Sequence, residues 1–303
     1  DKAQAACAGV KTYYADGQEH VVTNDPARYS YMPTEFIHGL YDGGAGAGLE
    51  DYWSMMMKSP LFAGGFIWVF ADEGIKRPDT GQIDVAGNQA PDGIVGPYRE
   101  REGSFYAIKE IWGNETKKID AKKKWPAKMK PGVEMVGRVE GLGKGYAEIK
   151  ELSQGGVIAR IERKTGTLLS VERKGKKFSL NGGPRLAMTN GTLTKLVWQM
   201  RKDGWLQCDY TYTAKGTQDV FGVVFNYPEN LVKKKRWLGD GPFRVWKNRL
   251  RGVTFGEWKN DYNNTITGYS EWKYPEFKGC FSNVRWLQLE TTEGLITVVP
   301  ENI

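Results

Sequence analysis

The chain has 303 residues, of which 40% are hydrophobic and 13% aromatic, so it can form packed cores and is not a disordered tail. Its net charge is +7, and the excess lysine is concentrated between residues 117 and 130; no nucleic-acid motif accompanies it, so we expect no nucleic-acid partner. No apolar run reaches the roughly 18 residues needed to cross a bilayer, so we expect no membrane partner either.

The N-terminal segment, residues 1–28, is polar and irregular, and we expect in it a helix followed by a turn at residues 16–17. His20 stands beside Glu19 with no second ligand at helical or hairpin spacing, so a surface histidine is expected rather than a metal ligand. The chain starts at Asp1, without an initiator methionine or a basic-then-apolar signal pattern. We therefore expect an engineered, processed or partial chain.

The next stretch contains the first pattern that points to chemistry. Tyr29–Phe36 is predicted to be a strand, and a glycine-rich loop, the helix Leu49–Lys58 and a second strand, Gly64–Phe70, follow it. Strand, loop, helix and strand form the repeating unit of a parallel sheet or barrel. In such folds the ends of strands and the loops after them hold the reactive groups. Glu35 lies at such a strand end, and His38 follows three residues later.

The region after the second strand is a long loop and one more helix. Asp72 and Glu73 follow the strand directly, and residues 76–101 are rich in Asp, Gly and Pro. A loop of that length inside a compact domain is usually functional or clamped to another element. Ser104–Trp112 is predicted to be a helix capped by its first residue. Residues 114–132 then read as a lysine-rich linker.

Beyond the linker the pattern changes to short alternating apolar runs, such as residues 157–162 and 167–173. Glycine turns at residues 165–166 and 190–191 separate these runs. Regularly spaced short strands with glycine turns are typical of an antiparallel β-sandwich.

The three cysteines, Cys7, Cys208 and Cys280, have no CxxC spacing, so a zinc knuckle or a redox pair is not expected. A disulfide between Cys208 and Cys280 is one alternative. The odd count favours the other, three inert thiols.

Several of these motifs, in the same order along the chain, resemble those of glycoside hydrolase family 2, the β-galactosidase-type enzymes. In that family a strand-end Glu followed three residues later by His is the nucleophile motif, and Glu35 and His38 match it. The further matches are a Tyr-Trp pair on the next helix, a Gly-Gly-Phe-hydrophobic-Trp strand, an Asp-Gly-hydrophobic turn and a Trp-Leu-Gly-x-Gly-Pro motif: Tyr52 and Trp53, Gly64–Trp68, Asp92–Ile94 and Trp237–Pro242.

The resemblance implies a multidomain α/β plus all-β fold. Residues 1–113 would be the C-terminal part of a catalytic (β/α)8 barrel, 114–132 the linker, and 133–303 an antiparallel β-sandwich like the large C-terminal domain of the family. The barrel part would be about the last quarter of a whole barrel, which takes about 250 residues.

The implied activity is that of a retaining β-glycosidase, which hydrolyses O-glycosidic bonds at non-reducing ends through a glycosyl–enzyme ester. Glu35 would be the nucleophile, and the substrate a β-linked oligosaccharide or glycoside. The substrate-binding residues implied are His38, Trp68, Asp72 and Asp92.

A retaining enzyme needs a second carboxylate, which in this family lies in an Asn-Glu pair on an earlier barrel strand. The only Asn-Glu here, Asn114-Glu115, falls in the linker, so we expect the general acid/base outside this chain and no turnover by the chain alone. We identify no cofactor; family members often use Mg²⁺ and Na⁺, whose ligands would lie mostly outside this chain.

Two alternatives stay open beside the enzyme. In one, the sandwich binds carbohydrate through Trp237, Trp246 and Trp258. In the other, the chain is a structural fragment that needs complementation by the missing barrel strands, since exposed strand edges invite pairing. The sequence leaves a homo-oligomer open and fixes no compartment; the bacterial cytoplasm or periplasm would suit the resemblance.

Overall fold

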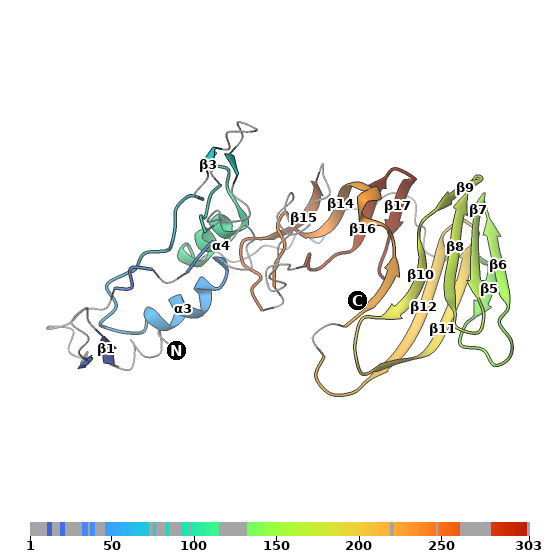
Figure 1. Ribbon diagram of the computed structural model, residues 1–303, viewed down its shortest axis with the longest axis horizontal. Helices are drawn as coiled ribbons and strands as arrows, with labels where there is room; N and C mark the ends of the chain where they lie inside the picture. The colour runs from blue at the N-terminus through green and yellow to red at the C-terminus, as the bar shows by residue number, and fades with distance from the viewer. Residues whose placement is uncertain are drawn as a thin grey trace. The chain divides into compact units, whose positions relative to one another are not determined.

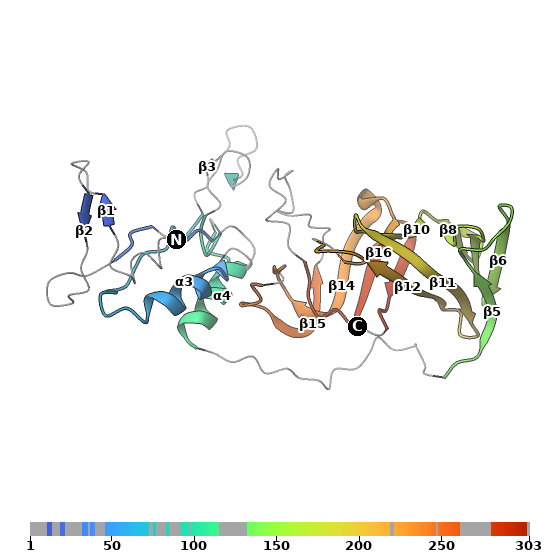
Figure 2. The ribbon, with the colours of Figure 1, turned by 90° about the horizontal axis from the view of Figure 1, so that it is seen from below.

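The computed structural model describes residues 11–13, 19–21, 32–35, 37–39, 46–72, 75–76, 83–84, 92–96, 98–114, 132–218, 221–246, 248–260 and 280–301. The chain divides into two compact units, drawn in Figures 1 and 2. The first comprises residues 1–123, 235–287 and 298–303, and the second residues 124–234 and 288–297. Residues 235–287, which we expected in the sandwich, thus group with the N-terminal part. The predicted linker lies almost entirely outside the described residues.

The first unit contains two helices where the sequence predicts them. These are α3 (Leu49–Met56) and α4 (Gly103–Trp112). In α3 the buried residues are the first and the last, Leu49 and Met56, which lie on one face two turns apart. Its first turn carries Glu50 and Asp51, whose charges suit the positive end of a helix. Both helix predictions are confirmed.

The predicted cap of α4 is wrong. The helix begins at Gly103, and its N-cap residue, Glu102, makes no side-chain capping hydrogen bond. Ser104 is fully buried, and its hydroxyl donates to the carbonyl oxygen of Gly39. The serine that the local pattern assigned to the helix cap therefore joins α4 to the segment that contains Gly39.

The short strands of the first unit lie outside the predicted ones. β1 (Lys11–Tyr13) pairs antiparallel with β2 (Glu19–Val21), so the helix expected near the N-terminus is wrong for residues 11–13. The turn expected at residues 16–17 lies outside the described residues. At the start of the predicted long loop, β3 (Ile75–Lys76) pairs antiparallel with β4 (Ile83–Asp84).

Residues 64–70 form no regular strand, nor do the described residues of the predicted strand 29–36. Single hydrogen bonds join the segments instead: Phe66 N–H donates to the Pro33 carbonyl (2.9 Å) and Trp68 N–H to that of Ile37 (3.0 Å). One parallel bridge joins Ala71 to Val95. Pro33 has no N–H to donate, which helps to interrupt a ladder here. Three segments thus lie side by side, but the residues described in this part of the chain show no barrel.

A four-stranded sheet with the order β15-β14-β16-β17 carries the Trp-Leu-Gly-Asp-Gly motif. Its strands are β14 (Val232–Gly241), β15 (Thr254–Asn260), β16 (Trp286–Thr291) and β17 (Gly294–Val298). β14 and β15 are antiparallel and place Gly239 opposite Gly256. Trp237 is buried, and its indole N–H donates to the carbonyl oxygen of Asp240 (2.9 Å).

The second unit consists of antiparallel sheets. One has the order β6-β7-β8-β9, another β12-β11-β5, and β10 pairs with β13. A single 3-10 turn, η1 (Glu229–Leu231), precedes β14. The strands are β5 (Met135–Glu140), β6 (Ile149–Gln154), β7 (Val157–Glu162), β8 (Thr167–Arg173), β9 (Lys176–Phe178), β10 (Asn181–Leu186), β11 (Gly191–Arg201), β12 (Leu206–Ala214) and β13 (Val223–Asn226).

The two larger sheets of this unit share one hydrophobic core. In β7 the alternate residues Ala159 and Ile161 are fully buried, as expected for a strand with one face toward a core. They pack with Trp198 and Met200 of β11. This layering of antiparallel strands agrees with the predicted β-sandwich.

The described residues bear on two predictions, the state of the cysteines and the expectation of no membrane span. Cys208 and Cys280 are both free thiols, so the alternative of a disulfide between them is wrong, while Cys7 lies outside the described residues. Among the helices that the structure describes, none is long and apolar enough to cross a bilayer.

Candidate functional site

The candidate site lies where the segment 37–39 meets the turn 92–94. Gly39 N–H and Val69 N–H both donate to the carbonyl oxygen of Asp92, at 2.7 and 3.0 Å. A Cβ on Gly39 would lie 1.9 Å from the carbonyl oxygen of Gly93, so only glycine allows this approach. The close backbone contact holds His38 beside Asp92.

Three predicted site residues form a row of side chains. His38 Nε2 lies 3.2 Å from Glu35 Oε1, and His38 Nδ1 lies 3.2 Å from Asp92 Oδ1. The exposed fractions of the side chains fall along the row, from 54% for Glu35 through 39% for His38 to 19% for Asp92. A neutral imidazole donates to one of the two carboxylates, and a protonated one to both. Glu35 thus sits at the open end of a row that orients the histidine.

The side chain of Trp68 is partly open to solvent, and its backbone is bonded next to this row. Its backbone N–H donates to Ile37, the residue before His38, and 39% of its surface is exposed. Phe66 and Phe70, two residues away on either side, are more exposed still, at 60% and 61%. Large aromatic rings at this exposure mark a contact surface for a ligand or a protein partner.

Asp72 is the most buried of the predicted site residues, with 6% of its surface exposed. Its Oδ1 accepts a hydrogen bond from Gly93 N–H (2.8 Å), and its Oδ2 has no partner among the described residues. Burial raises the pKa of this carboxyl to about 6, and the charges of Glu100 and Asp92 add to the rise, while the Gly93 bond lowers it. The structure therefore places Asp72 under the turn 92–94, which carries Asp92. Glu73 lies outside the described residues.

No local pattern in the sequence predicted a second polar cluster, which lies between α3, α4 and Arg251. The guanidinium of Arg251 donates to Glu50 of α3 (2.6 and 2.9 Å) and to Glu110 of α4 (3.1 Å). Glu110 is buried, and it also accepts the N–H of Gly252 (2.7 Å). We call these three side chains the Arg251 clamp. Its members lie 141 and 201 residues apart in sequence, so no local spacing could reveal them.

The tryptophans of the alternative carbohydrate-binding site do not form a platform. Trp237 is 1% exposed and packs against Phe281, with ring centroids 4.4 Å apart, so its predicted sugar contact is wrong. Arg249 covers the ring of Trp246 at 4.9 Å. Trp258 donates its indole N–H to the Thr254 carbonyl (3.1 Å).

Among the residues that the structure describes, we identify neither a metal site nor a second catalytic carboxylate. Within the described ranges no group of three His, Cys, Asp or Glu side chains could hold a metal ion. The Mg²⁺ and Na⁺ that the resemblance implies therefore have no ligand set among these residues, and no chemical step below is assigned to them. Glu115, from the only Asn-Glu pair, lies outside the described residues.

Comparison with known proteins gives one partial likeness. No family model matches the chain. A β-galactosidase from Halalkalibacterium halodurans is 33% identical to it over 61 residues, which are 20% of this chain and 6% of that enzyme. The chain thus spans a small part of the curated relative it matches. The likeness supports at most a glycosidase-like relationship.

Proposed function

We propose that the chain is part of a retaining β-glycosidase of the β-galactosidase type, with Glu35 as its nucleophile. The observation that carries the proposal is the row formed by Glu35, His38 and Asp92, together with the exposed side chain of Trp68. A carboxylate at the open end of such a row can reach a ligand, whereas a carboxylate in a closed ion pair cannot. The partial likeness to a β-galactosidase supports the same conclusion.

In the proposed reaction, one carboxylate oxygen of Glu35 attacks the anomeric carbon of the sugar as the bond to the leaving oxygen breaks. The leaving oxygen takes a proton from a carboxylic acid that we expect outside this chain. Water, deprotonated by the same group, then attacks the anomeric carbon and releases Glu35. His38 faces Oε1 of Glu35, so the other oxygen is left for the attack.

The neighbouring groups position the nucleophile and the sugar. Asp92 Oδ1 lies 3.2 Å from Nδ1 of His38 and orients the ring. Trp68 offers an apolar face to the C–H face of a sugar ring. In this proposal residues 1–113 belong to the end of a (β/α)8 barrel, and the rest of that barrel supplies the acid.

Trapping of the ester tests the proposal. The protein is extended by its upstream coding sequence and incubated with 2,4-dinitrophenyl 2-deoxy-2-fluoro-β-galactoside, whose leaving group needs no acid. We expect one glycosyl adduct, on the peptide that contains Glu35, and none in Glu35→Gln. Glu229→Gln, an exchange of an exposed carboxylate far along the chain, should leave labelling unchanged. A label on another carboxylate would refute the assignment of Glu35.

The exposed aromatic side chains near residue 68 favour a second proposal, that missing barrel strands complement this chain. Phe66 and Phe70 are large apolar rings with most of their surface exposed. Barrel strands supplied from the upstream sequence would cover such rings. Size-exclusion chromatography of the chain with and without an upstream fragment checks this; persistence of the two separate peaks in the mixture would contradict it.

A further inference from the structure

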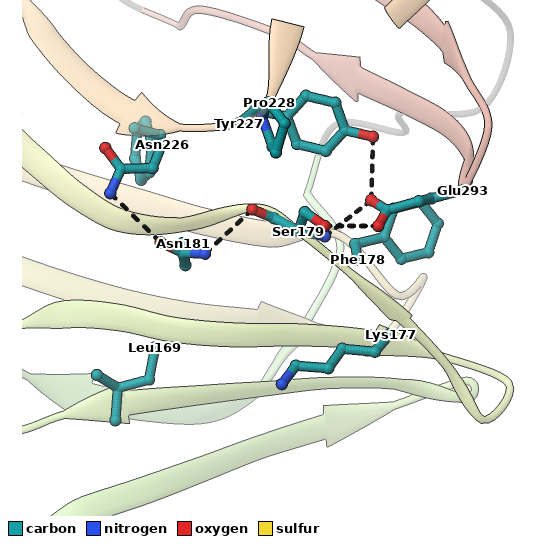
Figure 3. Close-up of a pocket in the computed structure, with 10 residues that line it drawn as sticks. Leu169, Lys177, Phe178, Ser179, Asn181, Asn226, Tyr227, Pro228 and Glu293 are labelled. Atoms are coloured by element: carbon teal, nitrogen blue, oxygen red, sulfur yellow. Dashed lines mark hydrogen bonds between the residues drawn. The ribbon is translucent and has the colours of Figure 1, made fainter. Parts of the chain in front are cut away.

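The second unit contains a pocket that plays no part in the proposed reaction. It has a volume of about 840 Å³, within the range of about 300–1,000 Å³ usual for small-molecule sites. Its walls come from several elements: β8, β9, the segment between β9 and β10, the start of β10, the end of β13 and the residues after it, and the turn between β16 and β17 (Figure 3). The lining residues are Leu169, Lys177, Phe178, Ser179, Asn181, Phe225, Asn226, Tyr227, Pro228 and Glu293.

Glu293 is fixed in this pocket by three donors. Ser179 donates both its N–H (2.8 Å) and its hydroxyl (2.6 Å), and the Tyr227 hydroxyl donates at 3.0 Å. Burial raises the pKa of Glu293, but these hydrogen bonds and the charge of Lys176 outweigh it, so the pKa lies below its usual value. The carboxylate is ionised at neutral pH. Its Oε1 accepts one bond and keeps a lone pair for a ligand.

Lys177 brings the opposite charge. Its ammonium makes no hydrogen bond or ion pair with any described residue, so its three N–H donors are open to a ligand. In Figure 3 it lies with Leu169 on the other side of the pocket from Tyr227. One ammonium and one carboxylate leave the lining without net charge. A charged ligand therefore gains nothing overall, while a neutral ligand that both donates and accepts can use both groups.

The remaining polar groups of the lining are held in place by hydrogen bonds, and aromatic rings lie beside them. Asn181 donates to the Ser179 carbonyl (3.1 Å), and Asn226 accepts from Arg185 (2.6 Å). Asn226 also donates to Asn181 (3.4 Å), so the two amides lie together, and the rings of Phe178, Phe225 and Tyr227 complete the lining. Fixed polar groups beside aromatic rings match a pyranose, whose hydroxyls project around an apolar C–H face.

From this arrangement we infer that the pocket is a binding site for a neutral saccharide. Hydroxyls of the sugar donate to Glu293 on one side of the pocket and accept from Lys177 on the other, and the ring packs against the aromatic side chains. The site lies entirely in the second unit and is separate from Glu35. It also differs from the tryptophan set of the sequence prediction. Its existence does not depend on the proposed glycosidase activity.

Isothermal titration of the full 303-residue chain with lactose and with digalacturonate tests this inference. We expect saturable binding of lactose. Lys177→Met, which keeps the apolar stem and removes the ammonium, should weaken it by about fivefold to tenfold, as should Glu293→Gln. Lys174→Met on the same exposed hairpin, outside the lining, is the matched control and should change the dissociation constant less than about twofold. Unchanged melting temperatures show that the variants fold.

The outcomes separate this site from the proposed catalytic one. Glu35→Gln should bind lactose in the pocket as the parent chain does, even if trapping at Glu35 fails. Absence of heat with lactose would overturn the inference. So would equal affinities of the parent and both pocket variants. If only digalacturonate binds, and salt abolishes that binding, the contact belongs to the lysines of the β8–β9 hairpin, and the inference of a site for a neutral saccharide is overturned.

Discussion

Replacement of Arg251 by methionine should destabilise the first unit although the substitution lies far in sequence from both helices. The change removes three charge-assisted hydrogen bonds, two to Glu50 and one to Glu110. It also leaves Glu110, whose side chain is 10% exposed, with the Gly252 N–H as a partner. Breaking a fully buried pair costs about 3–5 kcal/mol.

The expected loss is smaller than that limit because part of the clamp faces solvent. The Arg251 side chain is 32% exposed and that of Glu50 43%, so water replaces part of what is removed. We expect the free energy of unfolding to fall by about 2 kcal/mol, in the range of hydrogen bonds to charged groups. For a unit of this size, this corresponds to a melting temperature lower by about 4–8 °C.

Thermal unfolding followed by circular dichroism, together with amide exchange of α4, measures the effect. Arg138→Met is the control, since Arg138 pairs with Glu140 at the surface and such pairs contribute about 0–1 kcal/mol. A double-mutant cycle with Glu110→Gln should give a coupling energy of about 1 kcal/mol or more. A change at Arg251 no larger than that at Arg138 would refute the account of the clamp.

Three further predictions follow from single residues. The pKa of Asp72 is raised to about 6, so its contribution favours the folded state at low pH and is lost as the pH rises from about 4 through 6. Asp72→Asn should therefore raise the free energy of unfolding, measured in urea, by about 2 kcal/mol at pH 7.5 and by almost nothing at pH 4. An equal gain at both pH values would contradict this prediction. Gly39→Ala should cost about 1–3 kcal/mol in the same assay, because the new Cβ meets the Gly93 carbonyl; a neutral result would contradict the close approach. Burial raises the pKa of Cys208 to about 12, so iodoacetamide at pH 8 should leave it unlabelled in the folded chain by mass spectrometry, and rapid labelling would show that it is accessible.

The local patterns of the sequence were enough to predict the helices and the antiparallel part of the fold. Helical periodicity marked α3 and α4, and alternation with glycine turns marked strands such as β7. The strand predicted over residues 64–70 is wrong, because an unbroken apolar stretch does not show whether its backbone groups pair with a neighbouring strand. Its pairing depends on distant segments that a window of residues does not contain.

In the candidate site, too, contacts between residues close in sequence could be predicted, and contacts between distant residues could not. Glu35 and His38 are three residues apart, so their proximity could be predicted, whereas Asp92 entered only through the family resemblance. Glu293 and Ser179 are 114 residues apart, and nothing in either local sequence points to the other. The serine at 104 shows a related limit: its residue type fits a helix cap, but the approach of Gly39 decides what it binds.

The Arg251 clamp also bears on how the chain folds during synthesis. Arg251 leaves the ribosome 141 residues after Glu110, which at about 5–20 residues per second is a delay of about 7–28 s. Until then Glu110 has neither Arg251 nor the N–H of Gly252 as a partner, while the whole stretch 124–234 of the second unit emerges in between. The N-terminal helices must therefore wait for a late segment to complete their packing, and a nascent chain stalled before residue 251 would expose them to chaperones.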